Sequence, residues 1–258
     1  MSWECYPIET AQSGSQTEYP KRMTEPLLLL PGMMSDARVF LQQIVAFSRE
    51  RSVQVADLSQ GETVEQIAEQ VLDAAPSRFA LVGHGMGGVV AMEVLRRASN
   101  RVTRLALLDT NAQSETPAMA AAREAQIVKA KAGRLQDAIR DGVKSTDLAP
   151  GPRNAAVLKL LMDMAMDIGP ETYIRQCRVM QRRPDQQKTL RTMRAPALVM
   201  CGVYDELTPI RRHEFMATLI PYAKLEIVGD AGHFPMLEQP EETTRLLRAW
   251  LEQPLILR

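Results

Sequence analysis

Four apolar runs without polar alternation constrain the fold of this chain more than any other feature. They lie at 26–30, 78–83, 102–108 and 195–202, and "PLLLL" is the first of them. A strand that is apolar on both sides has to be covered on both sides, which is typical of parallel sheets. The runs at 52–58 and 223–229 predict two further strands.

Helical spacing separates these runs, so strands and helices alternate along the chain. The helices are expected at 36–50, 63–75, 87–99, 208–220 and 239–253. Ser35 and Asp36 are candidate N-caps of the first helix. Pro240, with Glu241 and Glu242 behind it, suits the beginning of the last.

From about 111 to 187 no strand-like run occurs, and Thr116-Pro117 is typical of a helix start. We therefore expect an α/β fold: a mostly parallel twisted sheet, helices on both faces, and an inserted all-helical cap. The expected divisions are a polar N-terminal tail at 1–25, a core at 26–111 and 188–258, and the cap at 112–187.

Composition narrows the classes of partner. The 258 residues contain 31 Lys and Arg against 31 Asp and Glu, so charge predicts neither nucleic-acid nor membrane binding. No apolar run approaches the roughly 18 residues of a membrane helix, and the first residues lack the apolar centre of a signal peptide. Three cysteines match no zinc spacing and predict a reduced, cytoplasmic protein without a metal or cofactor.

The stretch "VGHGMGG" at 82–88 has two interpretations. The first is a dinucleotide-binding turn, because the pattern G-x-G-x-x-G is formed between a strand and a helix by Gly83, Gly85 and Gly88. Asp109 ends the next strand, at the place where an acid would bind a ribose hydroxyl of the dinucleotide. However, a dinucleotide turn usually opens its domain, whereas two strand–helix units precede this one. The other interpretation is a hydrolase nucleophile turn, G-x-S-x-G, with Gly85 in place of serine.

Two later loops favour the hydrolase interpretation. Asp205 and His233 each follow the end of one of two consecutive predicted strands. Loops after the carboxyl ends of parallel strands gather at one edge of the sheet, which also holds the turn at Gly85. The order turn, acid, histidine is that of a Ser-Asp-His hydrolase. The loop after "LLLLPG" could contribute a backbone N–H to an oxyanion hole.

With these motifs in place, the chain resembles the α/β-hydrolase family, in its branch of capped esterases, lactonases and C–C bond hydrolases. The resemblance runs from about 26 to 251. It is carried by four motifs: Leu30-Pro31-Gly32, Gly83–Gly88, Gly202–Pro209 and Gly232–Pro240.

The resemblance implies roles for particular residues. Asp205 would be the acid, His233 the base, and the backbone N–H groups of Met33 and Met86 the oxyanion donors. A helical cap would shape a pocket for a small apolar ester or lactone. The residues expected to line that pocket are Gly32, His84, Met162, Met166 and Phe234.

Gly85 departs from the family pattern, since glycine has no group that can attack a carbonyl. The expected function is hydrolysis of small esters or lactones, with little acyl-enzyme chemistry in this chain. Serine-independent base chemistry by His233 and Asp205 is one alternative. A non-catalytic binding protein is another, and the dinucleotide interpretation is the most remote.

Several polar residues have plainer expectations. His84 is expected to pack beneath the turn, and His213 to lie on a solvated helix face. Glu206 is an alternative acid to Asp205. The arginine pairs are also expected on solvated helix faces; they are Arg96-Arg97, Arg182-Arg183 and Arg211-Arg212.

Overall fold

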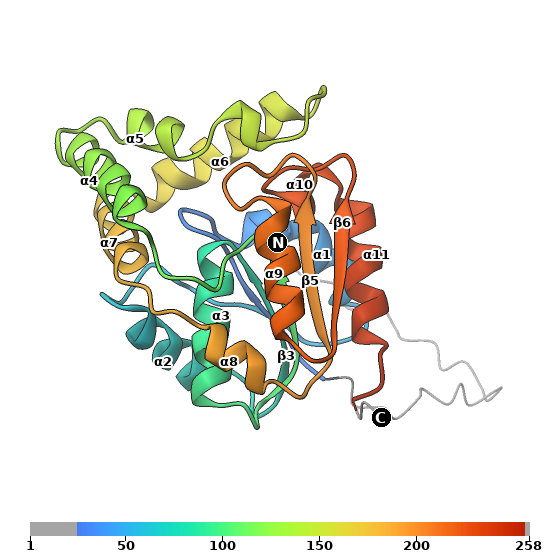
Figure 1. The fold of residues 1–258 in the computed structure, drawn as a ribbon. Coiled ribbons are helices and arrows are strands. Elements are labelled where there is room, and N and C mark those ends of the chain that lie inside the picture. Colours follow the sequence, from blue (N-terminus) through green and yellow to red (C-terminus); the bar gives the residue numbers. More distant parts are fainter. Residues whose placement is uncertain (1–24, 256–258) are drawn as a thin grey trace, which may run out of the picture.

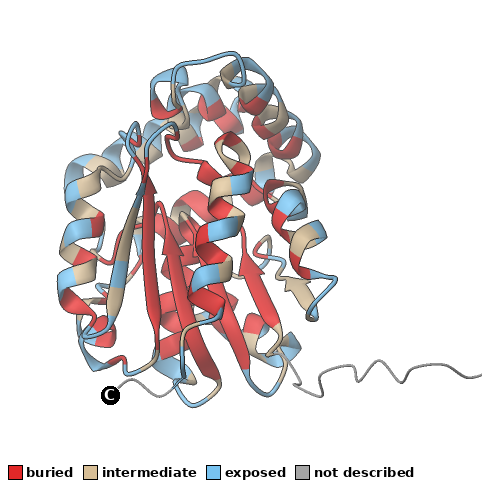
Figure 2. Ribbon diagram, turned by 90° about the vertical axis from the view of Figure 1, so that its right-hand side faces the viewer, coloured by how far each residue is buried: buried red, intermediate tan, exposed pale blue. Residues whose placement is uncertain are grey.

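Six parallel strands form one twisted sheet at the centre of the molecule (Figures 1 and 2). The structure is a computed structural model that describes residues 25–255, so the predicted N-terminal tail lies almost wholly outside the described residues. The strand order is β2-β1-β3-β4-β5-β6, and every neighbouring pair is parallel. The strands are β1 Leu27–Leu30, β2 Val53–Val55, β3 Phe79–His84, β4 Val102–Leu108, β5 Ala197–Gly202 and β6 Ala223–Val228. All six predicted strands are confirmed.

The apolar runs are explained by burial on both faces of the sheet. Leu27 and Leu29 pack into one core cluster, whereas Leu28 and Leu30 pack into the other. Alternate residues of a strand point to opposite faces, so both sets have to be apolar. Figure 2 shows the inner strands buried along their length, with exposed positions on the outer sides of the helices.

Helices cover both faces of the sheet, as the predicted alternation requires. One core cluster joins the sheet to α2, α3, α8 and α9, and the other joins it to α1, α6, α10 and α11. The helices are η1 Ala37–Phe40, α1 Leu41–Phe47, α2 Val64–Ala74, α3 Met86–Arg97, α4 Pro117–Lys131, α5 Leu135–Gly142, η2 Ser145–Asp147, α6 Asn154–Ile168, α7 Pro170–Gln181, α8 Gln187–Thr192, α9 Ile210–Leu219, α10 Pro235–Glu238 and α11 Pro240–Leu251.

Two predicted N-caps are confirmed. The Asp36 side chain accepts from the N–H of Arg38 at the start of η1. The Thr116 hydroxyl accepts from the N–H of Met119, with Pro117 at the first position of α4. Such bonds satisfy N–H groups that a helix leaves unpaired at its start.

Helices α4 to α7 lie together beyond one end of the sheet (Figure 1). Between β4 and β5 the described chain contains only helices and loops. These helices share a small apolar core of their own, which includes Ile127, Ala138, Ala165 and Tyr173. No helix within residues 25–255 combines the length and apolarity needed to cross a bilayer.

Two glycines let β3 and α3 cross closely above β1. A Cβ added to Gly87 would lie 2.1 Å from the carbonyl oxygen of Leu30, and one added to Gly83 would lie 2.5 Å from the carbonyl oxygen of Gly87. Both distances are far inside van der Waals contact, and backbone atoms cannot swing aside. This close approach explains why positions 83 and 87 are both glycine.

We predict that Gly87→Ala destabilises the protein by more than about 3 kcal/mol, because the added methyl would force β1 and α3 apart. Chemical denaturation measures the effect. The control is Gly229→Ala, where an added Cβ meets no atom within 4 Å and where a surface change should stay within about 0.5 kcal/mol. Equal stability losses in the two variants would contradict this account of the crossing.

Candidate active site

Three segments remote in sequence meet at the carboxyl edge of the sheet. Gly85 follows β3, Asp205 follows β5, and His233 follows β6. Nδ1 of His233 lies 3.0 Å from Oδ2 of Asp205. A Cβ added to Gly85 would lie 3.6 Å from Nε2 of the same imidazole. The His233 imidazole therefore lies between the Asp205 carboxylate and the turn at Gly85.

The backbone of the turn at Gly85 has a positive φ. Its φ of 53° and ψ of −117° are unfavourable for residues with a Cβ, and Gly85 serves as the N-cap residue of α3. Its N–H donates to the carbonyl of Leu108 at 3.0 Å, and its own carbonyl accepts from the Thr110 hydroxyl at 2.7 Å. The turn is thus held by β4 and the residues after it, independently of any side chain at position 85.

Asp205 is buried, and both oxygens of its carboxylate accept hydrogen bonds. Besides His233, its carboxylate accepts from the backbone N–H of Thr208 at 2.9 Å and from the Thr208 hydroxyl. Burial opposes ionisation, but the His233 charge and these hydrogen bonds outweigh it and hold the pKa of Asp205 below its usual range. Glu206, the alternative acid, is exposed, whereas the bond to the imidazole comes from Asp205.

The His233 imidazole is held by the Asp205 carboxylate. Burial disfavours its charged form, but the Asp205 carboxylate outweighs burial and raises the pKa of His233 above its ordinary value. Nε2 makes no hydrogen bond to the described residues, and His233 lines the main cavity of the site. A group or a water placed above Gly85 could therefore give its proton to this nitrogen.

His84 supports the base from below. Its Nε2–H donates to the backbone carbonyl of His233 at 2.8 Å, and its ring lies 4.9 Å from that of Phe234, centroid to centroid. Burial lowers the pKa of His84 to about 3, so the imidazole is neutral at physiological pH. This confirms the prediction that His84 packs beneath the turn. A Cβ on Gly32 would lie 2.7 Å from its Nδ1, which explains the glycine there.

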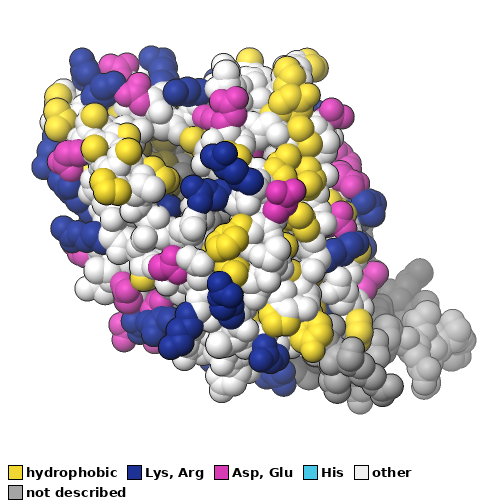
Figure 3. Space-filling model, in the orientation of Figure 1, with side chains coloured by type: hydrophobic (Ala, Val, Ile, Leu, Met, Phe, Trp, Pro, Cys, Tyr) yellow, Lys and Arg dark blue, Asp and Glu magenta, His cyan; other side chains and the backbone are white. Residues whose placement is uncertain are grey.

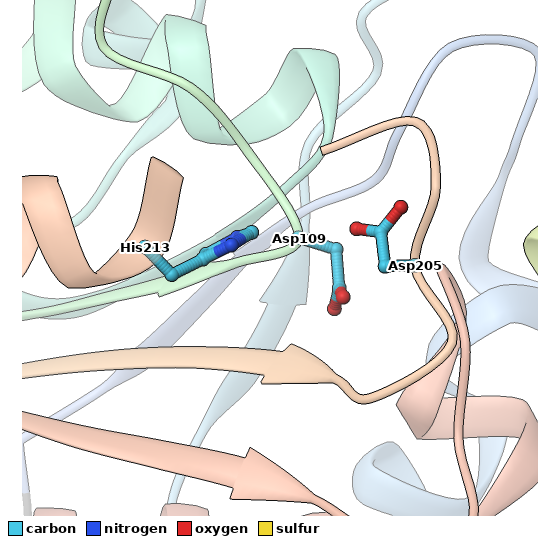
Figure 4. A group of neighbouring side chains, drawn as sticks. All are labelled: Asp109, Asp205 and His213. Atoms are coloured by element: carbon cyan, nitrogen blue, oxygen red, sulfur yellow. The ribbon is translucent and has the colours of Figure 1, made fainter. Parts of the chain in front are cut away.

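A buried acid and a buried histidine lie behind Asp205. Figure 4 shows Asp109, on the segment after β4, beside Asp205, with the His213 ring reaching from α9. Their side chains each place an oxygen or nitrogen within 4.8 Å of the others. Asp109 is wholly buried and accepts from the N–H of Gly202, and burial together with the Asp205 charge raises the pKa of Asp109 well above normal. These surroundings favour the uncharged form of the Asp109 carboxyl.

The prediction that His213 lies on a solvated helix face is wrong. His213 is 0 % exposed, and its Nε2 accepts from the backbone N–H of Thr110 at 3.0 Å. Burial lowers the pKa of His213 to about 4. Nε2 of His213 and both oxygens of Asp205 already have protein partners, so this cluster is poorly suited to hold a metal ion.

Backbone contacts bind the His233 loop to the segment between α5 and α6. The N–H of His233 donates to the carbonyl of Asp147 at 2.7 Å. The Glu238 carboxylate accepts from the N–H groups of Gly232 and Phe234 within the loop, and from that of Ala149 across the gap. The loop that carries the base is thereby joined to the helices above the sheet.

A cavity of about 300 Å³ opens over the site. Figure 3 shows a hollow on this face of the molecule, close to α4 and α5. The backbone N–H groups of Met33 and Met86 bond no other backbone group in the described chain, and both residues line the cavity. Of the other residues predicted for the site, the cavity is lined by Gly32, His84, Gly85, His233 and Phe234.

The structure places the other two predicted pocket residues elsewhere. Met162 lines a neighbouring hollow with Met33, Met34 and Phe234, and Met166 is 44 % exposed. Both lie on α6, of which Val157, Leu161, Met164 and Ala165 are the buried residues. The expectation that Met162 and Met166 line the cavity over His233 is therefore wrong.

Sequence analysis gave no functional role to four charged residues that line the cavity: Glu115, Arg123, Asp141 and Arg183. Arg183 was expected on a solvated face, but it is only 5 % exposed. Arg123 and Glu115 line the cavity beside it. Glu115 precedes α4, Arg123 lies on it, and Arg183 follows α7, which packs against α4. These residues are far apart in the sequence, so no local spacing could have revealed them.

Comparison with known proteins fits this geometry. The model of the family described as "Alpha/beta hydrolase family" matches residues 27–246. The chain belongs to that family. Among curated relatives, a pimeloyl-[acyl-carrier protein] methyl ester esterase of Aromatoleum aromaticum is 27 % identical over 208 residues, or 73 % of this chain and 80 % of the relative.

Solved hydrolases share the fold. A thermophilic esterase from Thermogutta terrifontis is 27 % identical, with a TM-score of 0.77, over 88 % of this chain and 89 % of that one. The enol-lactonase from Burkholderia xenovorans, 23 % identical with a TM-score of 0.79 over 89 % of this chain and 92 % of that one, resembles it in fold. The family assignment favours the hydrolase interpretation of the glycine turn over the dinucleotide one.

The pKa directions at this hydrolase-like site predict that one histidine titrates above its ordinary value. Burial takes the pKa of His84 to about 3 and that of His213 to about 4, so His233 alone among the three histidines should titrate above 6.5. In Asp205→Asn, burial acts without the carboxylate, and the pKa of His233 should fall below 6.5. NMR titration of the imidazole signals measures both, and an unchanged pKa would refute the pairing.

The same pair predicts how stability depends on pH. The pKa of His233 is raised, so its contribution is fully present below about 6.5 and is lost as the pH rises through the folded-state pKa. The pKa of Asp205 is lowered, so its contribution disappears only in strong acid. The difference in free energy of unfolding between the parent and Asp205→Asn should therefore be largest at pH values below about 6.5 and above the strongly acidic range in which Asp205 becomes protonated.

Proposed function

We propose that the chain carries the site of a small-ester or lactone hydrolase in which Gly85 occupies the nucleophile position. The observation that carries this proposal is the 3.6 Å between Nε2 of His233 and a Cβ added to Gly85. A hydroxyl on that Cβ would stand within hydrogen-bond reach of the imidazole, which Asp205 already orients.

The remaining parts of the mechanism have candidates at the same place. The N–H groups of Met33 and Met86 line the cavity without backbone partners, and they would donate to the developing oxyanion. Met86 starts α3, so the positive end of that helix also faces the reacting oxygen. Helices α4 to α7 would act as a cap that encloses a small, largely apolar substrate, and the ester and lactone hydrolases among the similar proteins support that class.

In this mechanism the hydroxyl at position 85 would attack the carbonyl carbon while His233 takes its proton at Nε2. The two backbone N–H groups would hold the negative oxygen, and the imidazolium would then protonate the leaving alkoxide. Water, activated by the same nitrogen, would release the acyl group. With glycine at position 85 the first of these steps has no nucleophile.

We predict that Gly85→Ser creates esterase activity, with kcat/KM for a short-chain nitrophenyl ester at least about a thousandfold above the parent. The reasoning is that loss of the serine costs a serine protease about a millionfold in turnover. The variant should also react stoichiometrically with a serine-directed phosphonate. It should lose roughly 1–3 kcal/mol of stability, because a side chain is added at a φ of 53°.

Gly85→Ala is the matched control for that experiment. It adds the same Cβ at the same strained backbone but no hydroxyl, so it should lose similar stability and gain no activity. If Gly85→Ser folds and remains as inactive as Gly85→Ala, the proposed catalytic arrangement is wrong.

A second candidate function is serine-independent base catalysis by His233, and one observation favours it. Nε2 has no partner in the described chain and faces the space that a side chain at Gly85 would occupy. A water there could be activated directly, or an acidic substrate proton removed. Alternatively, the chain binds a ligand in the cavity without turnover.

We predict that any slow hydrolysis of an activated lactone by the parent chain depends on this water position. His233→Ala should reduce the rate at least about a hundredfold, in line with general-base contributions. Gly85→Ala should also reduce it, because its methyl would lie 3.6 Å from Nε2 and exclude the water. Stopped-flow or pH-stat assays measure the rates, and turnover that survives His233→Ala unchanged excludes base catalysis.

A further inference from the structure

The upper part of the cavity holds two cations around a single anion. Nε of Arg123 donates to Oε1 of Glu115 at 2.5 Å, and Nη1 of Arg183 lies 3.3 Å from the same oxygen. Glu115 is the buried centre of the group, with a side chain that is 0 % exposed. One carboxylate therefore neutralises only one of two neighbouring guanidinium groups.

Both arginines have N–H groups for which the described chain provides no strong hydrogen-bond acceptor. Nη1 of Arg123 lies 3.6 Å from the thioether sulfur of Met33, a weak acceptor, and the Cys177 thiol is a second sulfur group beside the Arg123 guanidinium. Nε of Arg183 donates to the carbonyl of Gln113, and within residues 25–255 no oxygen or nitrogen accepts from the Nη2 group of either arginine. The side chain of Arg183 is 4 % exposed, and its pKa falls to about 10 through burial, so it stays charged at neutral pH.

No other charge at the cavity cancels this excess. Asp141 also lines it, but that carboxylate is paired with Lys129. Asp109 also lines the cavity, and burial together with the Asp205 charge raises the pKa of Asp109 well above its usual range, which favours the uncharged carboxyl. Around the arginines the lining is apolar, with Met119, Ile139 and Met180 among its residues. An unmatched cation in such surroundings is costly, and an anion that enters the cavity relieves the cost.

We propose that Arg123 and Arg183 form a carboxylate-binding subsite, and that the substrate is an ester or lactone that also bears a free carboxylate. This deepens the proposed function and rests on it for the identity of the reacting group. Arg123 touches Met33, whose N–H is the expected oxyanion donor, so the carboxylate and the ester carbonyl would be separated by a short chain. The planar guanidinium groups suit a carboxylate, because each can present two parallel N–H donors.

The first test measures binding to the chain as it stands, with two probes that differ in one charge. Monomethyl adipate has one methyl ester and one carboxylate, and dimethyl adipate is its neutral counterpart. Calorimetry should show the half-ester binding about tenfold or more tightly, as expected for charge-assisted hydrogen bonds. Equal affinities would overturn the proposal.

Four variants locate the preference. Arg123→Met should abolish the tenfold preference, and Glu115→Gln should increase it, because the carboxylate that competes for the guanidinium groups is removed. Arg182→Met is the matched control: this neighbour of Arg183 is exposed and should retain the full preference. Arg183→Lys tests the second arginine while it keeps the buried positive charge, whose loss could prevent folding. The variant should weaken the preference, because a single ammonium lacks the planar pair of donors.

Hydrolysis in the Gly85→Ser background separates the two proposals. If that variant hydrolyses both adipate esters equally, with no dependence on Arg123, the catalytic proposal stands and the carboxylate subsite is wrong. If it hydrolyses neither, while the parent still binds the half-ester through Arg123, the subsite stands and the catalytic proposal fails. If both hold, the half-ester is preferred through a lower KM, and Arg123→Met raises that KM with little change in kcat.

Discussion

The parallel alignment of β3, β5 and β6 is the constraint on which the site depends. Parallel strands end at the same edge, so the residues that follow them are neighbours in space although they are far apart in sequence. Gly85, Asp205 and His233 meet for this reason. The sheet in turn requires burial on both faces, which the uninterrupted apolar runs supply. The chemistry of the site is thus a consequence of the hydrophobic pattern as much as of the polar residues themselves.

The surroundings of Gly85 preserve what a side chain there would need. The turn keeps its left-handed backbone, held by Leu108 and Thr110, and the imidazole points at the empty position. Glycine is the residue that tolerates this backbone best, so it avoids strain that a serine would carry, and it offers no hydroxyl. Stability and reactivity are therefore opposed at this one position, which is common where active sites store strain.

The sequence predicts the parts of this structure that local pattern controls. The strands follow from their apolar runs, the helix starts from Asp36 and Thr116, and the bond of Asp205 with His233 from two loops of recognisable form. It fails where long-range packing decides. His213 and Arg183 carry ordinary surface chemistry, yet α9 and the end of α7 turn them inward. Met162 and Met166 have the right periodicity, but which cavity a helix faces depends on its neighbours and not on its own spacing.

The bonds that join His233 to Asp147, and Glu238 to Ala149, have a mechanical consequence. The connection between α5 and α6 is fastened to the same loop that aims the imidazole. A movement that lifted this connection away from the sheet would pull the base out of line with Asp205. Any movement of the helical layer that leaves the imidazole paired with Asp205 would therefore involve the opposite side of that layer, toward α4.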